Sequence, residues 1–230
     1  MDLSGHGCSD HRSYLGAYNI WQDLIEILMV ADRMEWKTFS VMGHSRGSVI
    51  GMLLAGCFPE RIMSNVMIEW VLPDFADVVS MPQQIAKSIS SSLLLHHRAR
   101  HYYDTKESAV SARVNGKFPV LPEAALALAQ RGVHHEEGGY FWSSDPKLLA
   151  PSEIKLSQVD AQECITAFTQ KSLVILGDKG LLAPHVNSVK WVRDNPKLAI
   201  HFIPGDHHLH MSSDIHALSV MLTLINDYFS

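Results

Sequence analysis

The apolar residues of the N-terminal third change their spacing twice, which indicates a helix, then a strand, then another helix. Between Tyr18 and Glu35 they recur every three or four residues, as on one face of an amphipathic helix. The short apolar run "KTFSVMG" follows and ends at a glycine, a pattern typical of a buried strand. The next run, "SVIGMLLAGCF", is rich in small residues and predicts a closely packed helix that ends before Pro59.

The same alternation continues on both sides of a long irregular section. "IMSNVMIEWVL" predicts another buried strand. The C-terminal part predicts the strand "KSLVILG", a helix over "HVNSVKWVRDN", the strand "LAIHFIPG" and a final helix "IHALSVMLTLINDYF". Because strands and helices alternate, we expect an α/β fold with a mostly parallel sheet, helices on both faces, and functional loops at the carboxyl ends of the strands.

The middle section breaks this alternation into helical pieces and loops marked by several prolines. We therefore predict a core formed by residues 1–72 and 163–230 and an inserted helical cap of residues 73–162. The cap contains the aromatic stretch "GVHHEEGGYFWSSDPKLL". This stretch is either a wall of a substrate pocket or a loop anchored by Tyr140, Trp142 and the phenylalanine between them.

Composition narrows the classes of partner. With 47% hydrophobic and 19% charged residues, the 230-residue chain resembles ordinary globular proteins. A formal net charge of −5 gives no electrostatic reason to expect nucleic acid or an anionic membrane as a partner, although the segment "HHRARH" is locally basic. Three widely spaced cysteines, with neither a targeting pattern nor a membrane-spanning pattern, predict a cytoplasmic location.

One pentapeptide gives the first chemical signal. Gly43-His44-Ser45-Arg46-Gly47 lies between a predicted strand and a predicted helix, where a sharp turn lifts a serine hydroxyl above the edge of a sheet. We expect both glycines to be needed, because a Cβ would clash in such a turn. The backbone N–H of Arg46 then lies at a helix N-terminus, where it can stabilise an oxyanion. We predict that Ser45 is a nucleophile, and the alternative is a serine that caps the helix.

A serine nucleophile needs a base, and the segment "FIPGDHHLHM" supplies candidates. His207, His208 and His210 follow the last predicted strand, so we expect them at the same sheet edge as Ser45. The alternatives are a surface cluster of histidines or a metal site. We predict neither a metal nor a cofactor, because no acidic or cysteine ligand of recognisable spacing accompanies these histidines.

These motifs make the chain resemble an α/β-hydrolase, and specifically the serine hydrolase-like proteins. The resemblance rests on the stretches "DLSGHGCSD", "MGHSRGSVIGMLLAGCFPERI", "GGYFWSSDPKLL" and "IPGDHHLHM". In the family the loop after the last strand commonly reads Gly-His-x-x-His, which matches His207 as the base and His210 as the second histidine. Asp206 replaces the usual glycine and Ser212 replaces a usual acid, so His208 stays an alternative base.

The resemblance leaves two candidates for the acid that orients the base. Many family members carry it in a Gly-x-x-Asp loop after the penultimate strand, but in "GDKGLL" the matching position is Gly180, and Asp178 comes two residues earlier. Others carry it after the strand that follows the elbow helix, where this chain has Glu69. A carboxylate in an apolar run needs a partner, and a histidine that accepts the serine's proton would be one. We prefer Glu69 to Asp178, the alternative being a glutamate that faces solvent.

Two further expectations concern the residues that contact the substrate and the strands that the family has before the start of this sequence. We expect His44, Trp70, Tyr140 and Trp142 to contact the substrate. In the family an earlier strand and its His-Gly loop supply the second oxyanion donor, whereas this sequence begins at "MDLSGHG", which matches the tail of the next strand and a loop at the pocket rim. We therefore expect the first strands of the fold to be absent and self-association through the exposed sheet edge.

Two functions from different classes follow. The leading hypothesis is a serine hydrolase that cleaves a small ester or a related acyl substrate, with Ser45 attacking, His207 transferring the proton and Glu69 orienting the imidazole. The alternative is a catalytically impaired hydrolase-like fragment that acts as a binding or partner-dependent module. Haloalkane dehalogenation is disfavoured, because that chemistry uses a carboxylate nucleophile and this turn carries a serine.

Overall fold

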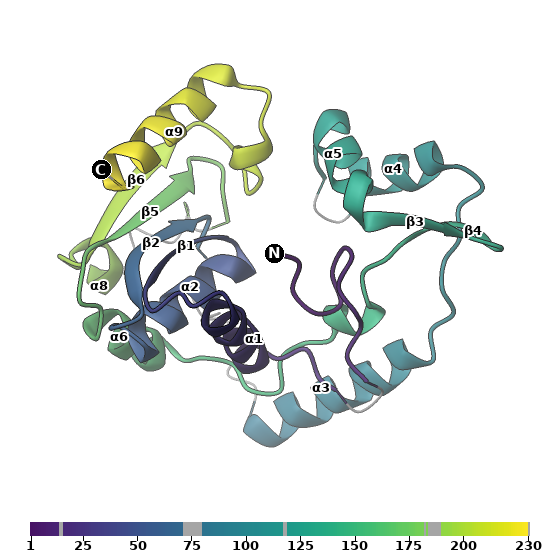
Figure 1. Ribbon diagram of the computed structural model, residues 1–230, viewed down its shortest axis with the longest axis horizontal. Helices are drawn as coiled ribbons and strands as arrows, with labels where there is room; N and C mark the ends of the chain where they lie inside the picture. The colour runs from purple at the N-terminus through teal and green to yellow at the C-terminus, as the bar shows by residue number, and fades with distance from the viewer. Residues whose placement is uncertain (14–15, 71–79, 117–118, 182, 184–189, 230) are drawn as a thin grey trace. The chain divides into compact units, whose positions relative to one another are not determined.

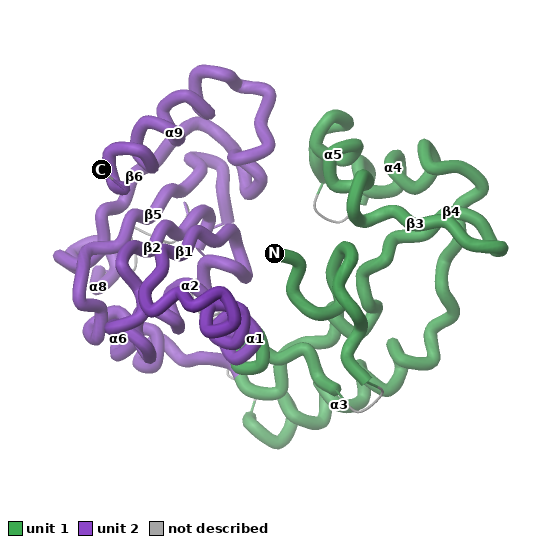
Figure 2. The backbone as a smooth tube through the Cα atoms, viewed as in Figure 1, with its two compact units in different colours: residues 1–23, 78–154 green, residues 24–77, 155–230 purple. Residues whose placement is uncertain are grey.

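The computed structural model describes residues 1–13, 16–70, 80–116, 119–181, 183 and 190–229. The chain divides into two compact units, shown in different colours in Figure 2. Unit 1 comprises Met1–Asp23 and Val78–Ile154, and unit 2 comprises Leu24–Asp77 and Lys155–Ser230. Helix α1 (Ile20–Arg33) runs from the end of the first segment into unit 2.

Unit 2 contains the parallel sheet that the sequence pattern predicts. Its strands are β1 (Phe39–His44), β2 (Ile62–Ile68), β5 (Ser172–Gly177) and β6 (Leu198–Ile203). Within the described residues they pair in the order β1-β2-β5-β6, and each pairing is parallel (Figure 1). The carboxyl ends of these strands therefore meet at one edge of the sheet, and so do the loops that follow them.

Helices pack on both faces of this sheet. α2 (Arg46–Cys57) contacts β1 and β2, while α9 (Ile215–Phe229) contacts β5 and β6. Val66 of β2 lies in a buried cluster with Met221 of α9, whereas its neighbour Asn65 approaches Gly51 of α2. Because successive side chains of a strand point to opposite faces, these two helices cover opposite faces of the sheet.

Shorter helices complete unit 2. α6 (Gln158–Thr166) packs against α2, α8 (Lys190–Arg193) contacts β6, and the 3₁₀ turn η2 (Leu209–Met211) contacts α9. The final helix has the bounds that its apolar run predicts. Most of the predicted helix over "HVNSVKWVRDN" lies outside the described residues, which include it only from residue 190 onwards.

Unit 1 consists of helices and a hairpin. The helices are α3 (Met81–His96), α4 (Lys106–Val114), α5 (Pro122–Gly132) and the 3₁₀ turn η1 (Pro146–Leu149). Strands β3 (Val133–Glu136) and β4 (Gly139–Trp142) pair antiparallel. This hairpin was not among the predicted elements, and its strands are joined by the two residues Glu137 and Gly138.

The first 23 residues belong to unit 1, whereas the predicted core included residues 1–72. Hydrogen bonds to the middle section explain the difference: Tyr18 to Asp145 at 2.7 Å, His11 to Ser143 at 2.7 Å, and Arg131 to Asp2 at 2.6 Å. The stretch "MDLSGHG", expected as the tail of a strand, forms turns, because Gly5 and Gly7 adopt positive φ angles. Within unit 1 this stretch helps to line a cavity of about 640 Å³.

Two surface features bear on the expected partners. Strand β1 is at the end of the described sheet, and its Met42 side chain is exposed. Self-association through this edge stays a prediction. Among the helices of the described ranges, none has the length and apolar character needed to cross a membrane.

Candidate active site

Ser45 lies at the bend between β1 and α2. Its backbone has φ 53° and ψ −114°, a conformation of the kind that costs a non-glycine residue about 1–3 kcal/mol. Its N–H donates to the carbonyl of Ile68 at 2.9 Å, which ties the bend to the end of β2. Its side chain makes no capping hydrogen bond to α2, so the interpretation as a helix-capping serine is wrong. Arg46, the first residue of α2, places its backbone N–H at the start of the helix.

The glycine before Ser45 is required by sterics, and the glycine after it is not. A Cβ at Gly43 would lie 2.2 Å from the backbone oxygen of Gly47 and 2.7 Å from the nitrogen of Ser48. Apart from its chain neighbours and the backbone of its own helix, a Cβ at Gly47 would meet no atom of the described chain within 4 Å. The expectation that both glycines avoid a clash therefore holds for Gly43 only. The buried hydroxyl of Ser48 closes the turn at 2.7 Å from the carbonyl oxygen of Gly43.

The side chains of Ser45, His207 and Glu69 form a hydrogen-bonded chain. Nε2 of His207 lies 3.0 Å from Oγ of Ser45, and Nδ1 of His207 lies 3.1 Å from Oε2 of Glu69. The three residues follow β1, β6 and β2, whose carboxyl ends meet at one edge. With its Nδ1–H donated to the carboxylate, the imidazole presents an acceptor nitrogen to the hydroxyl group.

Glu69 reaches His207 from a buried position. The residue is 1% exposed and has φ 49°, so its backbone, like that of Ser45, lies in the region that favours glycine. Oε1 accepts the N–H of Gly177 at 2.7 Å and Oε2 accepts the N–H of Leu181 at 3.0 Å. A Cβ at Gly180 would lie 2.1 Å from Oε1. The carboxylate therefore occupies the space that a side chain at position 180 would need.

The structure separates the alternatives that the sequence left open. Oδ1 of Asp178 accepts a hydrogen bond at 2.9 Å from a backbone N–H of the loop after β6, so this carboxylate joins two loops. The carboxylate that contacts His207 is that of Glu69. His208 donates its backbone N–H to Asp206 at 2.7 Å, and it is the ring of His207 that meets the serine.

Further histidines pack around His207. Nε2 of His44 donates to the carbonyl oxygen of His207 at 2.7 Å, so His44, expected to contact substrate, holds the backbone of the base. The ring centroid of His44 lies 4.7 Å from that of His207 and 4.1 Å from that of His210. Burial lowers the pKa of His44 below its ordinary value and lowers the pKa of His210 to about 4. Within the described ranges, no group of histidine, cysteine and carboxylate side chains could hold a metal ion.

The other expected substrate contacts lie in two places. Trp70 is fully buried in unit 2, where its ring meets Trp191 edge to face at 6.4 Å. Tyr140 and Trp142 lie on β4 in unit 1, and the indole N–H of Trp142 donates to the carbonyl of Ala109 at 3.0 Å. Contact of these three aromatic residues with a substrate stays a prediction.

A parallel sheet with a serine at the bend between a strand and a helix is typical of α/β-hydrolases, and comparison with known sequences gives the same family. Residues 1–132 match the family model of the alpha/beta hydrolase fold, so the chain belongs to that family. Within it, the chain groups with the serine hydrolase-like proteins. One from Dictyostelium discoideum is 26% identical over 233 residues, which cover 93% of this chain and 62% of that relative. One from Danio rerio is 22% identical over 238 residues, which cover 97% and 71% of the two chains.

Solved structures give the same fold. A hypothetical protein from Pseudomonas aeruginosa PAO1 is 33% identical with a TM-score of 0.90, covering 99% of this chain and 80% of that one. A thioesterase domain from the curacin biosynthetic pathway is 20% identical with a TM-score of 0.78, covering 97% of this chain and 79% of that one. At that identity the second likeness concerns the fold alone.

Proposed function

We propose that this protein is a serine hydrolase that cleaves a small ester or a related acyl compound through an acyl-enzyme intermediate. The observation that carries the proposal is the hydrogen-bonded chain from Glu69 through His207 to Ser45. The strained backbone of Ser45 supports it, since such conformations cluster at functional sites. The relatives named serine hydrolase-like proteins agree with this class of reaction.

In the first half of the reaction, Oγ of Ser45 attacks the carbonyl carbon of the substrate while its proton passes to Nε2 of His207. The carboxylate of Glu69 stabilises the imidazolium that forms. The oxyanion of the tetrahedral intermediate accepts a hydrogen bond from the backbone N–H of Arg46, whose position at the start of α2 adds the favourable end of the helix dipole. The intermediate then expels the alcohol, which takes the proton from His207.

In the second half, a water molecule replaces the alcohol. His207 accepts a proton from this water as it attacks the carbonyl carbon of the acyl-enzyme. The new tetrahedral intermediate releases the acid, and Oγ of Ser45 regains its proton from the imidazolium. His44 and His210 favour this cycle: burial keeps both rings neutral at neutral pH, so neither adds a positive charge beside the imidazolium of His207.

Hydrolysis of a short nitrophenyl ester tests the assignment of the nucleophile and the base. Ser45→Ala and His207→Ala should each lower kcat by roughly 10⁴–10⁶-fold, as expected when one member of a catalytic triad is removed. His208→Ala is the matched control and should keep most of the activity, because its ring is not the one that meets Oγ. Circular dichroism would establish that each variant folds. A larger loss in His208→Ala than in His207→Ala, or full turnover in Ser45→Ala, would contradict the proposal.

A further inference from the structure

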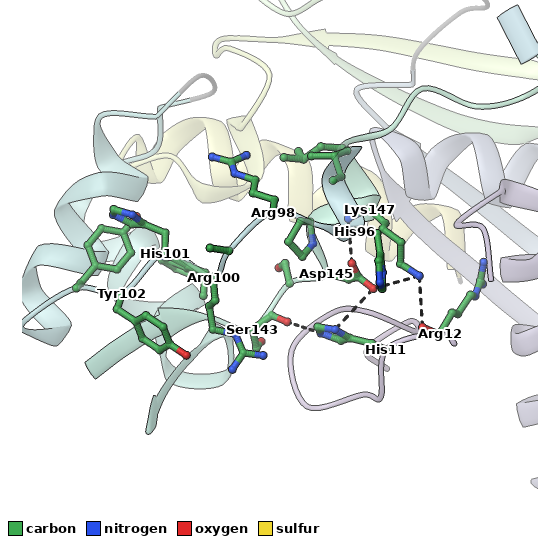
Figure 3. Close-up of a pocket in the computed structure, with 17 residues that line it drawn as sticks. His11, Arg12, His96, Arg98, Arg100, His101, Tyr102, Ser143, Asp145 and Lys147 are labelled. Atoms are coloured by element: carbon green, nitrogen blue, oxygen red, sulfur yellow. Dashed lines mark hydrogen bonds and ion pairs between the residues drawn. The ribbon is translucent and has the colours of Figure 1, made fainter. Parts of the chain in front are cut away.

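Unit 1 contains a cavity of its own, of about 630 Å³, that the serine chemistry does not use (Figure 3). Three segments of this unit line it: residues 11–12, residues 95–103 except His97, and residues 142–149 except Leu148. The second segment includes most of the "HHRARH" sequence that follows α3. This volume lies within the range of pockets that bind small molecules, about 300–1,000 Å³.

Among the described residues that line the cavity, four are lysine or arginine, and three of these have partners within the protein. Arg12 pairs with Asp23 at 3.0 Å, and Arg100 pairs with Glu136 at 2.6 Å. Nζ of Lys147 donates to the carbonyl of Ser13 at 2.9 Å and to two neighbouring carbonyls, and it lies 3.9 Å from Asp145. The positive charges of these three side chains are therefore offset by carboxylates or carbonyl oxygens of the protein. We expect them to contribute little to the attraction of an anionic ligand.

Arg98 is different. Among the residues that the structure describes, no carboxylate lies within ion-pair distance of its guanidinium group, and the side chain is exposed. His96 and His101 also line the cavity (Figure 3). Among the described residues that line the cavity, Arg98 is thus a cation without a compensating carboxylate. A guanidinium group presents two parallel N–H donors, the geometry that matches a carboxylate.

Aromatic side chains form another part of the wall, and protein contacts fix them in place. Trp142 is held by the hydrogen bond from its indole N–H to Ala109. Tyr103 pairs through its backbone with Tyr140, and its ring meets that of His101 edge to face at 4.5 Å. The cavity is therefore preformed, and its rigid ring surfaces favour a flat ligand over a flexible chain.

We propose that this cavity binds a small aromatic carboxylic acid, with the carboxylate on Arg98 and the ring against Tyr103 and Trp142. The site is distinct from the hydrogen-bonded chain at Ser45, and its occupancy does not depend on the serine reaction. A structural alternative for Arg98 is that its charge complements the C-terminal dipole of α3, which ends two residues earlier. That alternative predicts an effect of Arg98 on stability and none on binding.

Titration of the full chain with benzoate, followed by NMR, tests this proposal. Wild type should bind benzoate saturably and bind the neutral analogue benzamide much more weakly. Arg98→Gln should weaken benzoate binding about tenfold, the effect of losing one charge-assisted interaction. The control Arg33→Gln removes an exposed arginine from α1 and should leave the affinity unchanged. Ser45→Ala should also bind benzoate normally, so the result is independent of whether the protein is a serine hydrolase.

Several results would overturn the proposal. These are an absence of saturable benzoate binding by wild type, equal affinities of wild type and Arg98→Gln, and equal affinities for benzoate and benzamide. Tighter binding of phenyl phosphate than of benzoate would overturn the choice of a carboxylate. A lower melting temperature of Arg98→Gln with unchanged benzoate affinity would assign Arg98 to the helix dipole instead.

Discussion

Glu69 is a buried carboxylate whose two oxygen atoms are both hydrogen-bonded. Burying a charged group without partners is costly, and here two backbone N–H groups and the ring of His207 offset that cost. The backbone N–H groups hold the carboxylate in place whether or not the imidazole is protonated. The histidine is therefore oriented by a group that is itself fixed, which is what a positioning acid requires.

Replacing this carboxylate should impair catalysis far more than folding. Glu69→Gln keeps the shape of the side chain but removes the negative charge, so the imidazolium loses its counter-charge and the imidazole its required tautomer. We expect kcat for a nitrophenyl ester to fall by roughly 10²–10⁴-fold at neutral pH. Asp178→Asn is the matched control and should change kcat little, since Asp178 joins two loops. Equal losses in the two variants would contradict the assignment of Glu69.

At the scale of elements, the loop after β5 and the carboxylate that follows β2 fit together. Gly180 lies where the resemblance places the acid in many family members, and here the carboxylate of Glu69 fills the space beside it. The absence of a side chain at Gly180 thus leaves the space that the carboxylate of Glu69 occupies. A side chain larger than hydrogen at position 180 therefore conflicts with the carboxylate of Glu69.

Gly180→Ala should displace the carboxylate of Glu69 without removing it, because the new Cβ would lie 2.1 Å from Oε1. We expect kcat to fall in the same direction as in Glu69→Gln. The two losses should not add: Gly180→Ala combined with Glu69→Gln should be about as active as Glu69→Gln alone, since both act through one carboxylate. Steady-state kinetics of the two single variants and the double variant measure this coupling, and independent, additive losses would contradict it.

The turn at Ser45 offers a matched pair of substitutions for a stability measurement. Gly43→Ala should lower the free energy of unfolding by about 1–3 kcal/mol or more, because its Cβ would meet the backbone of Gly47. Gly47→Ala should be neutral or raise that free energy by up to about 1 kcal/mol, because alanine favours the first turn of α2 and meets no described atom outside its own helix. Urea unfolding followed by circular dichroism compares the two. Similar effects of both substitutions would contradict the steric asymmetry.

At the scale of the whole molecule, the sequence predicts the parallel sheet and its helices well, because short apolar runs of strand length alternate with segments of helical length. It points to Ser45 through the turn motif, and it places the candidate bases at the same sheet edge because the carboxyl ends of parallel strands converge. The preferences for His207 over His208 and for Glu69 over Asp178 came from the family resemblance. The sequence does not predict the positive φ angles of Ser45 and Glu69, which depend on contacts between strands. The hydrogen bond from His44 to the backbone carbonyl of His207 joins residues 163 positions apart, so no local sequence pattern could predict this contact.

The division of the chain into two units was also hard to predict, because it depends on contacts between residues far apart in the sequence. Residues 1–23 carry no long apolar period that would assign them to either unit. Their place in unit 1 depends on polar contacts with residues more than 100 positions away, such as that of Tyr18 with Asp145. The β3–β4 hairpin was missed because its strands are short and carry mixed polar and apolar residues.

The nucleophilic role of Ser45 is tested most directly by covalent labelling. The protein is incubated with a fluorophosphonate probe, digested, and examined by mass spectrometry to locate the modified residue. We predict one adduct, on the peptide that contains Ser45, with labelling lost in Ser45→Ala and strongly slowed in His207→Ala, because the serine needs its base to react. Labelling that persists in Ser45→Ala, or an adduct located on another residue, would contradict the assignment of Ser45 as the nucleophile.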